Sequence, residues 1–80
     1  MNKDKKDVVI YTTPGCHNCQ RAKDFLADMA NITTVDLSKN PNILTFLVEK
    51  TGQRSAPIIK IGETYISGFD KIKVIEALES

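Results

Sequence analysis

The sequence predicts an α/β fold with the element order β-α-β-α-β-β-α, in which four strands form a mixed sheet and three helices pack on it. Two observations support this prediction. The apolar residues occur first in short runs typical of strands, and then at the three- and four-residue spacing of helices. Glycine, proline and asparagine stand where one spacing gives way to the next. The chain has 80 residues, 41% hydrophobic and 26% charged, so we expect one domain spanning 1–80.

The first half of the chain predicts a strand, a helix and a second strand. Residues 7–12 are mostly β-branched or aromatic, as in a strand buried on both faces of a sheet, and we expect 1–6 to form a solvated leader. A turn at 13–15 ends that strand. The apolar residues then follow helical spacing at Ala22, Phe25, Leu26, Met29 and Ala30. Residues 32–37 alternate apolar and polar side chains, which predicts a second strand.

The second half predicts a helix, a hairpin and a last helix. Asn40 and Pro41 suit the N-cap and first turn of a helix that Gly52 ends. Its buried face would consist of Ile43, Leu44, Phe46, Leu47 and Val48. Residues 57–61 and 64–67 predict two antiparallel strands joined by a tight turn. The last helix would bury Ile72, Ile75 and Leu78, with Val74 beside them. The two helical crossovers imply parallel neighbouring strands with right-handed connections.

The charges of the chain nearly cancel, since 11 Lys and Arg residues stand against 10 Asp and Glu residues, for a formal net charge of +1. A nucleic-acid-binding face usually needs a marked excess of basic residues, so we expect no nucleic-acid partner. No apolar run reaches the ~18 residues of a membrane span, and the N-terminus lacks the apolar stretch of a secretory signal. We therefore expect a monomer in the cytoplasm, where thiols are kept reduced.

The two cysteines of the chain, Cys16 and Cys19, lie two residues apart between the first strand and the first helix. This spacing near a β-α-β pattern is typical of a dithiol redox motif. It brings the sulfurs close enough to bridge, and it leaves the first thiol at the positive end of the helix. Such a position can lower a cysteine pKa from ~8.5 to roughly 3.5–7.5. We expect Cys16 to attack a substrate disulfide and Cys19 to resolve the mixed disulfide.

A close pair of cysteines can also bind a metal or cluster, attach a haem or have a purely structural role. A structural zinc ion needs four ligands, and the motif offers only Cys16, Cys19 and His17, so zinc within one chain is disfavoured. A metal or Fe–S centre shared by two chains stays open. A c-type haem would need His where Gln20 stands and is excluded. Two merely structural cysteines are disfavoured because the motif opens a helix after a glycine turn.

His17 is the one histidine of the chain. As an imidazolium it would help hold Cys16 as a thiolate and so tune its reactivity. The interpretation that we favour is an exposed residue at the start of the helix that affects the redox couple only through its dipole.

The chain resembles a glutaredoxin-type member of the thioredoxin superfamily from about Val8 to its end. The segments that carry the resemblance are 10–12, 16–19, 55–57 and 67–70, which read Ile-Tyr-Thr, Cys-His-Asn-Cys, Ser-Ala-Pro and Ser-Gly-Phe-Asp. The resemblance implies a thioredoxin-like fold. It also implies a dithiol–disulfide oxidoreductase of electron transport and cell redox homeostasis, whose redox-active disulfide is Cys16–Cys19 and which binds no cofactor.

The resemblance also implies roles for residues outside the cysteine motif. Pro57 matches the family's cis-proline, and the backbone of Ala56 would pair with an extended substrate segment. Gly68 would admit a partner close to the backbone, and Phe69 would offer an apolar contact beside the cysteines. Three of these residues also have a plainer interpretation: Pro57 as the start of a strand, Gly68 as the end of a strand and Phe69 as core packing. For Tyr11 we favour a buried strand residue over a contact near the cysteines.

Departures from the family pattern bear on the reductant. Glutaredoxins that use glutathione tend to carry lysine where Thr13 stands, and a second acid where Lys71 stands. The carboxylates of glutathione need such charged partners. The chain therefore looks more like the redoxins that are reduced by thioredoxin reductase with NADPH and that donate electrons to ribonucleotide reductase. Asp70 and Arg54 could still contact glutathione or be solvated charges, so a glutathione-dependent glutaredoxin stays the alternative.

Overall fold

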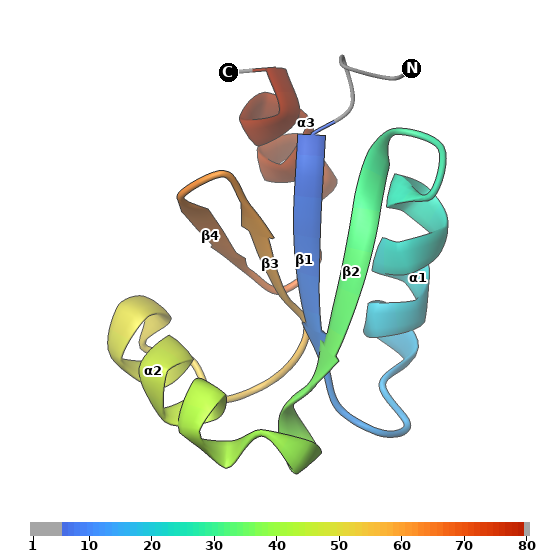
Figure 1. The fold of residues 1–80 in the computed structure, drawn as a ribbon. Helices are drawn as coiled ribbons and strands as arrows, with labels where there is room; N and C mark the ends of the chain where they lie inside the picture. The colour runs from blue at the N-terminus through green and yellow to red at the C-terminus, as the bar shows by residue number, and fades with distance from the viewer. Residues whose placement is uncertain (1–5, 80) are drawn as a thin grey trace.

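The computed structural model describes residues 6–79, which form a four-stranded sheet in the order β2-β1-β3-β4 (Figure 1). The strands are β1 (Lys6–Thr12), β2 (Ala30–Asp36), β3 (Ile58–Ile61) and β4 (Thr64–Ser67). β1 pairs in parallel with β2 and antiparallel with β3, and β3 pairs antiparallel with β4. The predicted mixed sheet is confirmed. Of the leader expected at 1–6, Lys6 belongs to β1 and the rest lies outside the described residues.

The helices within residues 6–79 lie on both faces of the sheet. They are α1 (His17–Leu26), a short 3-10 turn η1 (Leu37–Lys39), α2 (Pro41–Thr51) and α3 (Lys71–Glu79). α1 and α3 pack on one face and α2 on the other, because their buried residues belong to two separate apolar clusters. None of these helices is long and apolar enough to cross a membrane.

The two clusters are divided by the alternation of side chains along the strands. Ile59 points to the face that carries the larger cluster, to which strand residues and residues of α1 and α3 contribute. The other buried members of this cluster are Val8, Ile10, Ala22, Leu26, Ala30, Ile61, Ile66 and Val74. The adjacent Ile58 points to the opposite face, where it packs with Leu37 and Leu47 under α2. Each face of the thin sheet therefore has its own apolar core.

The direction of β3 differs from the sequence-based expectation. The second crossover was expected to return the chain parallel to β1, but β3 runs antiparallel to it. In Figure 1, η1 and α2 stay at the end of the sheet where β1 and β2 finish. The chain therefore re-enters the sheet from that same end, and β3 has to run in the opposite direction.

The end of the first helix also differs from the expectation. α1 ends at Leu26, and the Met29 amide donates to the Leu26 carbonyl at 3.0 Å to close a turn. Met29 is 37% exposed, whereas Ala30 is buried as the first residue of β2. Both residues fit helical spacing from Ala22, so the spacing alone could not show that the chain turns before them.

The apolar face of α3 agrees with the sequence prediction at Val74 and Leu78 and differs from it at Ile72 and Ile75. Val74 is fully buried, while Ile72 is 70% exposed and Ile75 is 40% exposed. Ala77 and Leu78 complete the contact with the sheet, at three and four residues after Val74. Both sets of positions have helical spacing, and packing against the sheet selects the set that contains Val74. Phe46 on α2, expected to be buried, is likewise 46% exposed.

α2 begins and ends where the sequence predicted, but the expected capping hydrogen bond at its start is not made. Gly52 ends the helix with a left-handed φ of 73°, and its amide donates to the Val48 carbonyl at 2.8 Å. Asn40 is the N-cap residue, but its side chain makes no capping bond. Its Nδ2 instead donates backward to the Asp36 carbonyl at 2.8 Å, which the turn of η1 brings within reach.

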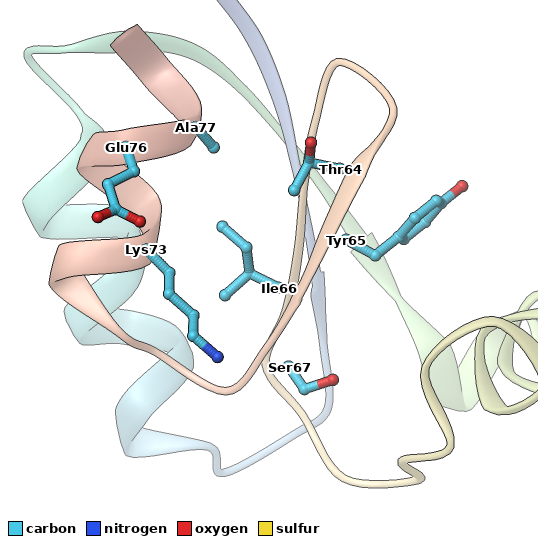
Figure 2. A pocket seen from close by; sticks show the side chains of 7 residues that line it. All are labelled: Thr64, Tyr65, Ile66, Ser67, Lys73, Glu76 and Ala77. Carbon is cyan, nitrogen blue, oxygen red and sulfur yellow. The ribbon is translucent and has the colours of Figure 1, made fainter. Parts of the chain in front are cut away.

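The β3–β4 hairpin forms the outer edge of the sheet beside α3. Figure 2 shows Thr64 and Ile66 of β4 directed toward α3, while Tyr65 points away from it. Residues of β4 and α3, among them Lys73, line an open cavity of about 490 Å³ between the two elements. Tyr65 instead reaches the face of the sheet under α2 and meets Phe46, with ring centroids 6.3 Å apart.

Truncation of Val74 tests the observed face of α3. Val74→Ala should lower the free energy of unfolding by about 2 kcal/mol, because it removes buried methyl groups from the core beneath the helix. Ile72→Ala, on the same helix, should change it by less than about 0.5 kcal/mol. Urea unfolding followed by circular dichroism gives both values. A larger loss from Ile72→Ala than from Val74→Ala would contradict the packing described here.

Candidate active site

The cysteine motif lies where the chain leaves the central strand β1 and enters α1. Cys16 is the N-cap residue of α1, with the extended backbone (φ −88°, ψ 108°) usual at that position. Its Sγ accepts a hydrogen bond from the Cys19 amide at 3.1 Å. The Cα atoms of Cys16 and Cys19 are 5.3 Å apart, and the two residues form a disulfide. The pairing expected from the spacing is therefore present.

The two sulfurs differ in exposure and in surroundings. Cys19 is 3% exposed and contributes to the buried side of α1, whereas Cys16 is partly exposed at the helix N-terminus. Backbone amides at that end of a helix are unpaired and stabilise negative charge. When the disulfide is reduced, the Cys16 thiolate gains this stabilisation and faces solvent. Cys16 is thus suited to attack and Cys19 to resolve.

A cavity of about 340 Å³ opens beside the disulfide, between the end of β1 and one side of α1. It is lined by Thr12, Thr13, Gly15, Cys16, His17, Cys19, Gln20 and Lys23. His17 is the first residue of α1 and is exposed to solvent. Its position agrees with the favoured interpretation of an exposed residue at the helix start, and its effect on the redox couple stays a prediction.

A second groove, of about 600 Å³, begins at Asn18, between the two cysteines, and runs toward the start of α3. Its other lining residues are Arg21, Phe69, Asp70, Lys71 and Ile72. Phe69 also packs against the larger apolar cluster and meets the Phe25 ring edge-on at 5.5 Å. Phe69 therefore serves core packing and lines the groove at once.

Two charged groups of this groove already have partners. The Asp70 carboxylate caps α3, accepting hydrogen bonds from the amides of Ile72 at 3.1 Å and Lys73 at 3.2 Å. The Lys71 ammonium lies 5.6 Å from the centre of the Phe25 ring. Asp70 thus has a structural role that the sequence analysis did not anticipate.

The loop before β3 approaches the loop after β4. The Ala56–Pro57 peptide bond is cis, as the resemblance implied. Gly68 follows β4 with a left-handed φ of 80°, and its amide donates to the Pro57 carbonyl at 2.8 Å. Within residues 6–79, the backbone amide and carbonyl of Ala56 make no hydrogen bond. These two groups are therefore unpaired within the described residues, and their pairing with an extended substrate segment stays a prediction.

The segment that leads into Ala56 is held by side chains that the sequence analysis did not single out. Thr51 Oγ1 donates to the Leu47 carbonyl at 2.8 Å and accepts from the Gln53 amide at 3.1 Å. Gln53 Nε2 in turn donates to Ser55 Oγ at 3.1 Å. These bonds connect the end of α2 to the loop that carries the cis-proline.

The remaining residues predicted for the site lie away from the two openings. Tyr11 is half-buried and packs with Leu47 and Ile58 under α2, so it is a strand residue that is only partly buried. Burial raises the pKa of the Tyr11 hydroxyl, with a smaller contribution from nearby Tyr65. Arg54 is exposed and lines neither opening.

No cluster of three or more His, Cys, Asp or Glu side chains able to hold a metal occurs in the part of the chain that the structure describes. The motif itself supplies two thiols and one imidazole. A centre shared by two chains is a separate arrangement, and it stays an alternative.

The family model for glutaredoxin matches residues 8–66 of the chain. A glutaredoxin of Neisseria meningitidis serogroup A is 38% identical over 64 residues, which cover 78% of this chain and 75% of the relative. A solved glutaredoxin–glutathione complex from buckwheat is 26% identical, with a TM-score of 0.74 over 90% of this chain and 76% of that one. The NrdH-redoxin of Escherichia coli, a glutaredoxin-like protein, shares the fold at 20% identity, with a TM-score of 0.74 over 88% of this chain and 92% of that one.

The fold, the cysteine pair at a helix N-terminus and these similarities define a thiol–disulfide oxidoreductase with a thioredoxin-like fold. More narrowly, the chain belongs to the glutaredoxin family.

Serine substitution tests the two thiol roles. Cys16→Ser should abolish disulfide reduction, because a hydroxyl at the helix N-terminus is far less nucleophilic than a thiolate. Cys19→Ser should instead accumulate a mixed disulfide with the substrate, since the resolving thiol is missing. Mass spectrometry after reaction with a disulfide peptide detects that adduct. Full activity in Cys16→Ser would contradict the assignment.

Replacement of His17 separates its two possible roles. Because the side chain is exposed and forms no hydrogen bond with a described residue, His17→Ala should leave the pH dependence of Cys16 alkylation by iodoacetamide unchanged. The measurement is the alkylation rate of the reduced protein between about pH 4 and 9, a window that spans the pKa range of activated thiols. A shift of the profile to higher pH would show that the imidazolium stabilises the thiolate.

Proposed function

We propose that the protein reduces disulfides in other proteins and is itself reduced by thioredoxin reductase at the expense of NADPH. The Cys16 thiolate attacks one sulfur of the substrate disulfide, and the other sulfur leaves as a thiolate that takes up a proton. Cys19, deprotonated, then attacks Cys16 Sγ and releases the second substrate thiol. The product is the Cys16–Cys19 disulfide, and two electrons have passed to the substrate.

The groove that starts at Asn18 carries this proposal. Ile72 is 70% exposed there, next to Phe69, so the groove offers an apolar surface within reach of the cysteine pair. The carboxylate of Asp70 and the ammonium of Lys71 already have partners in the fold. The groove therefore offers a ligand mainly apolar surface and the Arg21 guanidinium. Such a surface suits a side chain of a protein substrate better than a small, highly charged peptide.

The residue at position 13 supports the same proposal. Thr13 lines the cavity beside the disulfide and carries no charge. A glutathione carboxylate bound against the end of the strand would need a cationic partner on the strand, and Thr13 provides only a hydroxyl there. We propose a ribonucleotide reductase disulfide as a substrate on the resemblance described above. We further propose that the protein acts as a monomer in the cytoplasm, where reduced thiols can be maintained.

Glutathione is the second candidate reductant. The relative from Neisseria is named a glutaredoxin, and the buckwheat protein was solved with glutathione bound. Arg54 is exposed near the cis-proline loop in sequence, so it could pair with a carboxylate.

A coupled assay separates the two reductants. NADPH oxidation is followed while the protein reduces insulin, once with thioredoxin reductase and once with glutathione and glutathione reductase. The proposal requires turnover with thioredoxin reductase at a rate well above that with glutathione. Turnover with glutathione alone would contradict it and establish the second candidate. Cys16→Ser serves as the inactive control in both arms.

A further inference from the structure

The cavity beside the disulfide has one wall made by a single stripe of α1. Cys16, Cys19, Gln20 and Lys23 stand at positions i, i+3, i+4 and i+7, which fall on one side of a helix. Lys23 therefore lies one turn beyond Cys19, about 6 Å along the helix axis. The opposite wall comes from the end of β1, at Thr12 and Thr13.

Among the eight residues that line this cavity, Lys23 is the one lysine, arginine, aspartate or glutamate. It forms no ion pair with any residue in the range 6–79. The carboxylates of Asp24, next to Lys23 in sequence, and of Asp36 on β2 accept hydrogen bonds from other groups. Asp24 accepts a hydrogen bond from Gln20 Nε2 at 3.0 Å. Asp36, which lies opposite Thr12 in the β1–β2 register, accepts from the amide and hydroxyl of Ser38.

We propose that Lys23 selects disulfide substrates that carry a carboxylate close to the reacting sulfur. The Lys23 ammonium, on α1, supplies to this cavity the positive charge that Thr13, on the opposite wall, does not provide. This inference rests on the thiol–disulfide exchange described above and adds a specificity-determining residue to it. Lys23 makes no hydrogen bond to Cys16 or Cys19, so it positions the substrate while Cys16 performs the displacement.

The carboxylate can come from two sources with the same chemistry. One is the glycine carboxylate of a glutathione disulfide, and the other is an aspartate or glutamate side chain beside a cysteine of a protein. Both present a carboxylate a few bonds from the sulfur that Cys16 attacks. The reaction is balanced in either case, because the Cys16 thiolate displaces one substrate thiolate and forms one new S–S bond.

Three small disulfides of different charge test the role of Lys23 directly. The reduced protein is mixed with excess dithiodipropionate, hydroxyethyl disulfide or cystamine, which are anionic, neutral and cationic, and single-turnover rate constants are measured. Lys23→Gln should lower the rate constant for dithiodipropionate about fivefold relative to that for hydroxyethyl disulfide, as expected for one partly screened charge pair. The cationic disulfide should not slow, and Lys23→Arg should restore the wild-type ratio.

The matched control is Lys50→Gln, which removes the same charge from an exposed residue on α2, across the sheet from α1. It should leave the anionic-to-neutral ratio unchanged. An equal loss for all three disulfides in Lys23→Gln would mean that Lys23 acts on the Cys16 thiolate and would overturn the proposal. An unchanged ratio would also overturn it. If the wild-type protein reduced none of the disulfides, the proposed function itself would fail.

A second pair of comparisons identifies the source of the carboxylate. Glutathione disulfide is compared with its glycine ethyl ester, and a disulfide peptide with aspartate beside its cysteine is compared with the asparagine version. A loss in Lys23→Gln confined to glutathione disulfide identifies the glutathione carboxylate as the ligand. A loss confined to the aspartate peptide identifies an acidic protein segment. If Lys23→Gln does not lower the rate constant for either carboxylate-bearing substrate more than for its neutral counterpart, the proposal is wrong.

Discussion

The hydrogen bond from the Cys19 amide to Cys16 Sγ joins the fold to its chemistry. It satisfies one of the amides that every helix leaves unpaired at its start, and it uses the reactive sulfur as the acceptor. The bond can form only if α1 begins at His17, directly after the loop that follows β1. β1 is fixed in turn by neighbours on both sides, β2 and β3. An inner strand of the sheet, paired on both sides, therefore holds the reactive end of the helix.

The two openings beside the cysteines have different characters, although α1 contributes to both. The cavity lined by Thr12, Thr13 and Lys23 is mostly polar in its residues, with one cation. The groove that starts at Asn18 contains exposed apolar surface at Phe69 and Ile72. A disulfide-bearing chain has two sides at its cysteine, so one substrate can meet both openings together. Under the two proposals made above, specificity depends on two contacts of different chemistry.

The sequence predicted the chemistry better than it predicted the packing. The cysteine spacing, the glycine that ends α2 and the two-residue hairpin turn are local signals, and each is confirmed. The direction of β3 and the choice of Val74 over Ile72 depend on where α2 and α3 settle against the sheet. Those choices are made by contacts distant in sequence, which spacing along one segment does not contain. The capping role of Asp70 followed a local pattern and could have been found from its place before α3.

The sheet ends on one side at β2 and on the other at β4, and these two outer strands limit how copies of the chain can join. The unpaired backbone groups of an outer strand are a template on which another strand can add. β4 has four residues and so offers a short template. β2 has seven, but it exposes Asn31, Thr33 and Thr34, which give an added strand little apolar surface to bury. The growth of sheets from chain to chain, the route to fibrous aggregates, is therefore disfavoured at both edges.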